Sequence, residues 1–463
     1  MSEGVAIVGM SCRFAGAPDV PSFWRNVLSR ERFFSAPQDP ASARFVDPES
    51  NAFERVPTLR AGYLGDLWDY APAHGASDCP RGTDPAEILA MDLVASALHD
   101  AGIPDRPFAR DRAIAVFGAS RALNPANVGW MQLGIALDQT IDVVRQCFPG
   151  ASPASVAALR ESLRANIPDI DARAAQSLLP DSLSTRISAR FDMRGGHFSV
   201  DAGSASALVA LQSASDELLA GRSDIAVVGA VQQAMLPQLF MPLAHLGILS
   251  RLDAPLPFGA AADGMLPGEG GAVFVLKRAE EAEEDGDRVY AILRGFGVAS
   301  EGRSANVRSG PDESTHLRAL ERAYSAAGGR PEAGLIEAHA CGMPLWDRAE
   351  AYALASLFGA REGGWPSIAL GSVKGQSGHT GIAAAAAGVV KSALALHFRI
   401  LPPSPDCGEP QPAIHLDETP FYLATEARPW AHHGLRPRRA GVSAITLGGL
   451  HAHAVLEEQG ADR

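Results

Sequence analysis

One local pattern occurs twice in this chain: an apolar strand, then a polar turn, then a helix of small side chains. In the first half, the turn Asp201-Ala-Gly-Ser204 leads into a predicted helix over residues 205–219. In the second half, the turn over residues 372–379 leads into a predicted helix over residues 382–396, which begins with a run of alanines. Small side chains let neighbouring elements approach closely, and polar turns at strand ends meet at one edge of an α/β fold. The repeat therefore predicts one pseudo-symmetric α/β core with a site between its halves.

Other segments fit the same core. Residues 5–10 are short, branched and apolar, which is typical of a buried strand. We expect an N-terminal half over residues 1–260 and a C-terminal half over residues 261–463. Residues from about 124 to 182 are helical in pattern but broken by prolines, so they are predicted to leave the core as a helical excursion or dimer region.

Composition narrows the class of protein. With 463 residues, 46% of them apolar, the chain can bury a large core. The net charge of -13, without any run of Lys or Arg, argues against nucleic acid and anionic membranes as partners. No two of the five cysteines have the spacing of a metal site, and neither a signal peptide nor a long apolar span is seen. A cytoplasmic protein without structural metal is expected.

Five separated segments resemble the β-ketoacyl synthase domains of polyketide synthases. They occur in that family's order and cover nearly the whole chain: Val5-Ala-Ile-Val-Gly-Met-Ser-Cys-Arg-Phe, Arg186-Ile-Ser-Ala-Arg-Phe-Asp-Met-Arg-Gly-Gly, Ala262-Asp-Gly-Met-Leu-Pro-Gly-Glu-Gly, Glu337-Ala-His-Ala-Cys-Gly-Met-Pro and Gly371-Ser-Val-Lys-Gly-Gln-Ser-Gly-His-Thr. The resemblance implies a thiolase fold, an α/β fold of two pseudo-symmetric halves with a five-layer αβαβα core. It also implies a homodimer.

In that family, a cysteine takes an acyl group and condenses it with a decarboxylated malonyl unit. The resemblance implies no cofactor bound to the chain itself. The substrate is instead linked to phosphopantetheine and delivered by an acyl or peptidyl carrier protein, or by an upstream synthase.

The nucleophile position departs from the family. Its motif reads Val-Asp-Thr-Ala-Cys-Ser-Ser-Ser-Leu, and Val200-Asp-Ala-Gly-Ser-Ala-Ser-Ala-Leu208 aligns with it without a gap, which places Ser204 where the cysteine would be. A strand-to-helix turn offers free N–H groups and the positive end of the helix dipole to an acyl oxygen. The alternative is that Ser204 is an ordinary helix N-cap, because serine is favoured there.

Three further residues match the family's active-site groups. The resemblance implies that His339 and His379 lie beside the nucleophile, polarise the thioester carbonyl and stabilise an enolate. It also makes Lys374 the active-site lysine, whose buried charge would tune its neighbours. The sequence leaves open which histidine is the base.

The last family motif, Phe-Gly-Phe-Gly-Gly-Thr-Asn-Ala-His, is here Ile445-Thr-Leu-Gly-Gly-Leu-His-Ala-His453. The backbone N–H groups of Ser204 and Leu447 are the expected oxyanion hole. Leu447 replaces the phenylalanine that gates the acyl channel, and Gly448 and Gly449 are retained. In the first histidine motif, Cys341 and Met343 stand where the family has threonines. These residues are expected to line a rebuilt substrate pocket.

A serine nucleophile changes the expected chemistry. Its hydroxyl needs a base at hydrogen-bonding distance, and the oxoester that it forms is less electrophilic than a thioester. Elongation should be slow, whereas an intramolecular reaction gains effective concentration from tethering. The chain also stops soon after Leu456, so it is expected to be freestanding.

These features resemble the ketosynthase-like bicyclases of salinosporamide-type γ-lactam-β-lactone pathways, which close their rings by an intramolecular aldol reaction and lactone formation. Two alternatives remain open. One is a serine-dependent acyltransferase or esterifying synthase. The other is a non-catalytic subunit similar to a chain-length factor. In such a subunit, the motifs that differ from those of the family would reflect lost catalysis.

Overall fold

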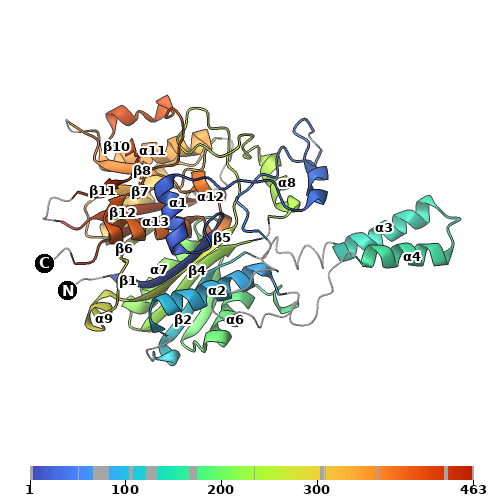
Figure 1. Cartoon of the computed structure of the whole chain (residues 1–463), viewed down its shortest axis with the longest axis horizontal. Coiled ribbons are helices and arrows are strands. Elements are labelled where there is room, and N and C mark those ends of the chain that lie inside the picture. The colour runs from blue at the N-terminus through green and yellow to red at the C-terminus, as the bar shows by residue number, and fades with distance from the viewer. Residues whose placement is uncertain are drawn as a thin grey trace.

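The computed structural model describes residues 4–50, 52–65, 83–103, 108–120, 133–165, 175–233, 235–302, 307, 309–361, 364–431 and 436–460. Cys79 lies outside these residues. Within them, the chain forms one mixed α/β body with a long helical hairpin on one side (Figure 1).

A single hydrogen-bonded sheet runs through the body in the order β10-β8-β7-β12-β13-β6-β1-β5-β4-β2-β3. Its strands are β1 (Val5–Phe14), β2 (Ala113–Gly118), β3 (Gly196–Val200), β4 (Ile225–Gln232), β5 (Gly270–Arg278), β6 (Ala291–Ser300), β7 (Leu335–Glu337), β8 (Ile368–Gly371), β10 (Phe421–Leu423), β12 (Arg439–Ile445) and β13 (Leu450–Glu457). The short strands β9 (Ile400–Leu401) and β11 (Arg428–Pro429) pair separately.

The sheet consists of two halves that meet at a narrow seam. β1 pairs with β5 along nearly its whole length, but with β6 only from Val5 to Ile7. On one side of the seam lie β1, β5, β4, β2 and β3, and on the other lie β6, β13, β12, β7, β8 and β10. In both halves the central strands are almost wholly buried, as expected for sheets covered on both faces.

Helices form the other layers. The helices outside the hairpin are α1 (Val20–Ser29), α2 (Pro85–Asp100), α6 (Ser182–Phe191), α7 (Ser206–Leu219), α8 (Pro237–Leu246), α9 (Ala279–Glu284), α10 (Glu313–Ala326), α11 (Pro344–Phe358), α12 (Lys374–Ser377) and α13 (Ala384–Phe398). α7 and α13 pack together in the core shared by the two half-sheets, α2 and α6 cover the outer face of the first, and α10 and α11 cover that of the second. This is the five-layer αβαβα arrangement predicted from the sequence.

α13 is buried on every side. All its residues from Ala384 to Leu396 are buried, and a Cβ on Gly388 would lie 2.8 Å from Glu337 Cγ. The alanine run therefore serves close packing. Among the described residues, Gly381–Phe398 is the one helical segment that is long and apolar enough to cross a membrane, and 83% of it is buried inside the protein.

The predicted helical excursion contains the hairpin. α3 (Leu133–Cys147) and α4 (Pro153–Arg164) pack on each other around Leu137, Ile141 and Val156, and project from the body in Figure 1. Residues 124–132 and 166–174 of the excursion lie outside the described residues. The hairpin has a small apolar core of its own.

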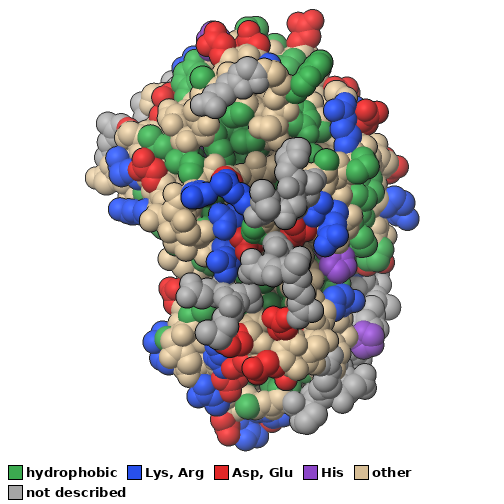
Figure 2. Space-filling view, turned by 90° about the vertical axis from the view of Figure 1, so that its left-hand side faces the viewer, with side chains coloured by type: hydrophobic (Ala, Val, Ile, Leu, Met, Phe, Trp, Pro, Cys, Tyr) green, Lys and Arg blue, Asp and Glu red, His purple; other side chains and the backbone are tan. Residues whose placement is uncertain are grey.

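The surface is mixed in charge. On the face seen in Figure 2, basic side chains gather near the middle, and acidic ones lie below them and at the upper edge. The described side chains of this face form no continuous basic field of the kind that tracks a phosphate backbone.

Candidate active site

Ser204 lies on a tight turn between β3 and α7. Gly203 has a φ of +54°, a conformation that favours glycine. Ser206 Oγ accepts the Ala202 N–H at 2.8 Å and donates to the Gly203 carbonyl at 2.7 Å. α7 begins at Ser206, so Ser204 sits just before its N-terminus, buried at 9% exposure. The family motif is therefore folded as the strand-to-helix turn that its sequence predicts.

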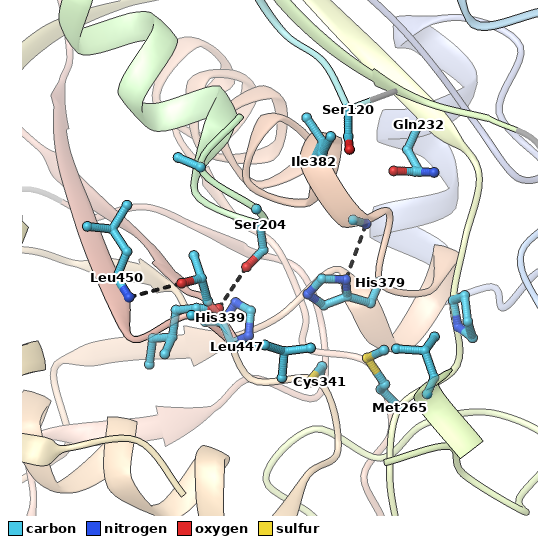
Figure 3. A pocket seen from close by; sticks show the side chains of 18 of the residues that line it. Ser120, Ser204, Gln232, Met265, His339, Cys341, His379, Ile382, Leu447 and Leu450 are labelled. Atoms are coloured by element: carbon cyan, nitrogen blue, oxygen red, sulfur yellow. Dashed lines mark hydrogen bonds between the residues drawn. The ribbon is translucent and has the colours of Figure 1, made fainter. Parts of the chain in front are cut away.

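The Ser204 hydroxyl contacts the other half of the molecule. Its Oγ donates a hydrogen bond of 2.7 Å to the carbonyl of Ile445, the last residue of β12 (Figure 3). Neither histidine of the site is hydrogen-bonded to this hydroxyl in the described part of the chain. The resting serine is thus positioned by a backbone carbonyl rather than activated by a base.

Two buried carboxylates of α11 accept hydrogen bonds from the backbone of the turn that carries His339. Glu350 accepts the N–H groups of His339 and Ala340, both at 2.8 Å. Asp347 accepts those of Cys341 and Gly342, both at 3.1 Å. Burial raises the pKa of Asp347 to about 6 and that of Glu350 to about 7.

His379 has a defined protonation state. Burial, with the charge of Lys374, lowers its pKa to about 3, so the ring is neutral at physiological pH. Its Nδ1 accepts the Gly381 N–H at 3.2 Å, which places the single ring proton on Nε2. Figure 3 shows this second nitrogen turned toward Ser204 and His339. His379 is therefore a hydrogen-bond donor to the cavity.

His339 lies edge-to-face with His379, with 5.3 Å between the ring centroids. It is buried, and burial together with Lys374 lowers its pKa well below the usual value. Its Nδ1 has no hydrogen-bond partner within the described residues. His339 Nδ1 thus differs from His379 Nδ1, which accepts the Gly381 N–H.

Lys374 lies behind the two histidines and does not line the cavity. Its Nζ donates to the Ala338 carbonyl at 3.1 Å, and its pKa is lowered by burial. A second buried cation lies nearby, since Lys391 forms a 2.6 Å ion pair with Glu337, and both side chains are 1% exposed. Lys374 thus acts on the site through its charge and through the His339 turn.

These elements enclose a cavity of about 560 Å³. It is lined by the predicted residues Ser204, His339, His379, Cys341, Met343, Leu447 and Gly448. Gly449, also predicted for the pocket, does not line the cavity. Its N–H donates to the Thr446 carbonyl, and its own carbonyl accepts the Glu301 N–H. Burial raises the pKa of the Cys341 thiol, so it remains protonated and contributes an apolar surface.

The backbone N–H groups of Ser204 and Leu447 have no hydrogen-bond acceptor among the described residues. Both residues line the cavity, and Leu447 is 39% exposed. Two free N–H groups on the cavity wall are what an oxyanion hole requires. Their role as an oxyanion hole remains a prediction.

The sequence motifs did not single out several other wall residues. The polar ones are Ser120, Asp201, Gln232 and Thr446, and the largest apolar ones are Met265, Leu243 and Trp346. Asp201 and Met265 lie inside motifs that were recognised, so a signal for them was present. Gln232 and Trp346 come from other parts of the chain, and only the fold brings them to the cavity.

Comparison with family models matches residues 2–282 to the β-ketoacyl synthase N-terminal domain and residues 290–407 to its C-terminal domain. Polyketide synthase ThaG of Burkholderia thailandensis is 31% identical over 98% of this chain and 8% of that protein. A phenolphthiocerol/phthiocerol polyketide synthase of Mycobacterium tuberculosis is also 31% identical, over 99% of this chain and 28% of that protein. The chain thus spans a small part of these relatives.

Solved structures show the same fold. The oxazolomycin ketosynthase domain OzmH KS7 of Streptomyces albus superposes with a TM-score of 0.80 at 28% identity, covering 99% of this chain and 75% of that one. The ketosynthase of module 6 of the Bacillus subtilis bacillaene synthase, solved as a cysteine-to-serine mutant, has a TM-score of 0.80 at 26% identity, covering 99% and 72%.

Proposed function

The chain belongs to the β-ketoacyl synthase family, and from this premise we propose that it takes a carrier-bound β-ketoacyl chain of polyketide or peptide origin onto Ser204 and cyclises it. The product would be a lactone, of the γ-lactam-β-lactone type. The observation that carries this proposal is a serine at the nucleophile turn, facing two neutral histidines across one cavity.

The first proposed step is acyl transfer. Ser204 Oγ attacks the thioester carbonyl, His339 takes the hydroxyl proton, and the carrier thiol leaves with a proton. The developing oxyanion receives hydrogen bonds from the N–H groups of Ser204 and Leu447. Because Ser204 donates to Ile445 at rest, its hydroxyl must first rotate toward His339.

The second proposed step is ring closure. His339 removes a proton from the carbon between the two carbonyls, and Nε2–H of His379 stabilises the enolate oxygen. The carbon then attacks a carbonyl further along the same chain. The resulting alkoxide attacks the Ser204 ester and forms the lactone, and the departing serine oxygen takes back the proton from His339. The steps are acyl transfers, proton transfers and one aldol addition with no net change of oxidation state, so the proposal needs no cofactor other than the phosphopantetheine arm that carries the substrate.

The proposal includes two kinds of protein partner. Carrier-protein delivery is supported by relatives that are polyketide synthases. A homodimer is supported by β3, a sheet-edge strand whose first three residues are exposed, with Phe198 at 40% exposure. An unpaired edge is a template for pairing with a second copy.

One observation favours a second candidate, a catalytically silent subunit. The Ser204 proton is directed at Ile445, and no base contacts the hydroxyl within the described residues. In a silent subunit this contact would be permanent and would serve only to join the two halves.

Intact-protein mass spectrometry separates the two candidates. Wild type incubated with β-ketoacyl N-acetylcysteamine thioesters should gain the acyl mass, at least transiently, and release a cyclised product. Ser204→Ala should lose both, whereas the matched variant Ser213→Ala, whose hydroxyl donates to the Val209 carbonyl within α7, should keep the acyl mass. Product formation by Ser204→Ala at the wild-type rate would refute the covalent mechanism, and no acylation of wild type would favour the silent subunit.

A further inference from the structure

The turn after β12, residues 446–449, carries the Leu447 N–H that faces the cavity. Its shape is fixed internally. Thr446 N–H donates to the Leu450 carbonyl and Leu450 N–H to Thr446 Oγ1, both at 2.9 Å. Gly449 N–H donates to the Thr446 carbonyl at 3.0 Å. These bonds define the turn but do not fix its distance from the nucleophile.

Glu301, directly after β6, anchors this turn from outside. Its N–H donates to the Gly449 carbonyl at 2.9 Å. Its carboxylate oxygen Oε1 lies 3.1 Å from His451 Nε2 and accepts the Asp312 N–H at 3.0 Å. Glu301 therefore holds the turn at two points, one through its backbone and one through its side chain.

The Glu301–His451 pair is well shielded from solvent. The side chain of His451 is fully buried and that of Glu301 is 3% exposed. Burial lowers the pKa of His451, while the hydrogen bond to Glu301 acts in the opposite direction. With the carboxylate as acceptor, the ring carries its proton on Nε2. A buried carboxylate is tolerated only when partnered, so the pair acts as a unit.

Val307, six residues after Glu301, contacts the histidine side of the cavity. The carbonyl of Val307 accepts the Trp346 Nε1–H at 3.0 Å. The Trp346 ring lines the cavity, with its centroid 6.3 Å from that of His339. Glu301 thus contacts the Leu447 turn, and Val307 contacts the wall beside His339.

The opposite face of the turn meets the nucleophile. Ile445, the residue before Thr446, accepts the Ser204 hydroxyl at 2.7 Å. The turn is therefore placed between two contacts, Ser204 on the cavity side and Glu301 with His451 on the other. A shift of Glu301 or His451 would change the distance from the Leu447 N–H to an acyl group on residue 204.

We propose that Glu301 and His451 are positioning residues that set the Leu447 N–H at the distance required to polarise the acyl carbonyl. This rests on the proposed acylation at residue 204. The family's last motif has asparagine at position 451, whereas this chain has a histidine, which is titratable. The pairing of His451 with Glu301 gives this departure from the motif a structural role.

The test measures the carbonyl stretch of the acyl-enzyme in a Ser204→Cys background, which does not depend on serine being a nucleophile. A ¹³C-labelled acyl N-acetylcysteamine thioester loads the protein, and infrared difference spectra report how strongly the carbonyl is hydrogen-bonded. Adding Glu301→Ala should move the band to higher frequency and slow acylation about tenfold, less than the loss of a whole oxyanion donor. Glu301→Gln, which keeps a hydrogen-bond acceptor, should remain close to the parent.

Asp100→Asn is the matched control for lost stability. Asp100 accepts the Tyr290 hydroxyl and the Met10 N–H far from the turn. This variant should lower Tm without moving the carbonyl band. If Glu301→Ala does not fold, His451→Leu removes the same contact and should give the same shift.

An unchanged band in a folded Glu301→Ala or His451→Leu protein overturns the inference, as does an equal shift in Asp100→Asn. Acylation of the Ser204→Cys background without acylation of wild type would defeat the proposed serine chemistry and leave the positioning role standing. If neither protein is acylated, both proposals fall.

Discussion

The two sides of the cavity are built differently. The first half of the sheet contributes a short turn with one exposed carboxylate, Asp201, in which Gly203 and Ser206 hold Ser204 with backbone and hydroxyl contacts. The second half contributes two neutral imidazoles, two buried lysines and three buried carboxylates, counted over the described residues of its turns, β7, α11, α12 and α13. Of these two sets of residues, only the second carries buried charge.

This difference bears on the serine that stands where the family motif has a cysteine. A cysteine near a helix N-terminus is readily ionised, whereas a serine hydroxyl stays protonated and needs a base, and the imidazoles that could provide one lie on the other side of the cavity. The groups that move protons lie opposite and are held independently. Variants on the two sides should therefore fail in different ways.

The largest expected effect is on stability, at the buried charges of the second side. Lys391→Met leaves Glu337 buried without its ion-pair partner and should cost about 3–5 kcal/mol in the free energy of unfolding. Ser206→Ala, on the first side, removes neutral hydrogen bonds and should cost about 1–2 kcal/mol. Urea denaturation measures both. Equal losses of unfolding free energy in the two variants would contradict the difference between the two sides.

The next effect concerns the role of His379. His379→Ala should slow product formation about 10²–10³-fold, the usual cost of losing a preorganised donor. His379→Asn offers an amide N–H in place of Nε2–H and should recover part of that loss. Steady-state and single-turnover rates give the ratio. If asparagine is as poor as alanine, His379 is a base and not a donor.

A smaller effect is the pH dependence of stability. Glu350, which faces the N–H groups of His339 and Ala340 and lies 3.8 Å from His316, has its folded pKa raised to about 7. Between the unfolded pKa of a glutamate, about 4.3, and pH 7 the folded state binds more protons, so this residue lowers stability as pH rises. His379, with its pKa lowered to about 3, acts in the opposite direction between pH 3 and about 6.5.

Glu350→Gln should remove the fall in stability with rising pH that Glu350 causes. The free energy of unfolding should change by on the order of 3 kcal/mol at most between pH 5 and pH 7.5. Tm measured across this range, beside wild type and Ser206→Ala, tests it. A slope that survives in Glu350→Gln would assign it to another group, such as Asp347.

The smallest effect is expected at the cavity entrance. Leu447→Phe restores the family's gating side chain at a position that is 39% exposed. It should raise KM for long or branched acyl chains a few-fold and leave kcat for short ones nearly unchanged. A kcat loss for every chain length would show that the substitution displaces the backbone N–H rather than narrowing the channel.

Local patterns predicted much of this molecule. The strand-turn-helix repeats and the five motifs were sufficient for the fold, and they placed Ser204, His339 and His379 on one cavity. The helix with the alanine run was expected to be central because small side chains allow close packing, and it is.

Other features depend on contacts between distant segments, which no local pattern encodes. The tautomer of His379 follows from a single N–H of Gly381. The Ser204–Ile445 bond joins residues 241 positions apart, and the Glu301–His451 pair joins residues 150 positions apart. The carbonyl partner of Lys374 is a further example, because its Nζ donates to Ala338, 36 positions away in the sequence.

The burial of α13 has a consequence for how the polypeptide is made. This helix is apolar enough to be mistaken for a membrane span, and β12 and β13, which help to cover it, follow it in the chain. A growing chain on the ribosome therefore presents α13 uncovered until those strands have emerged. During that interval we expect the exposed apolar surface of the helix to bind chaperones or the membrane-insertion machinery. A chain truncated before Arg439 should therefore aggregate.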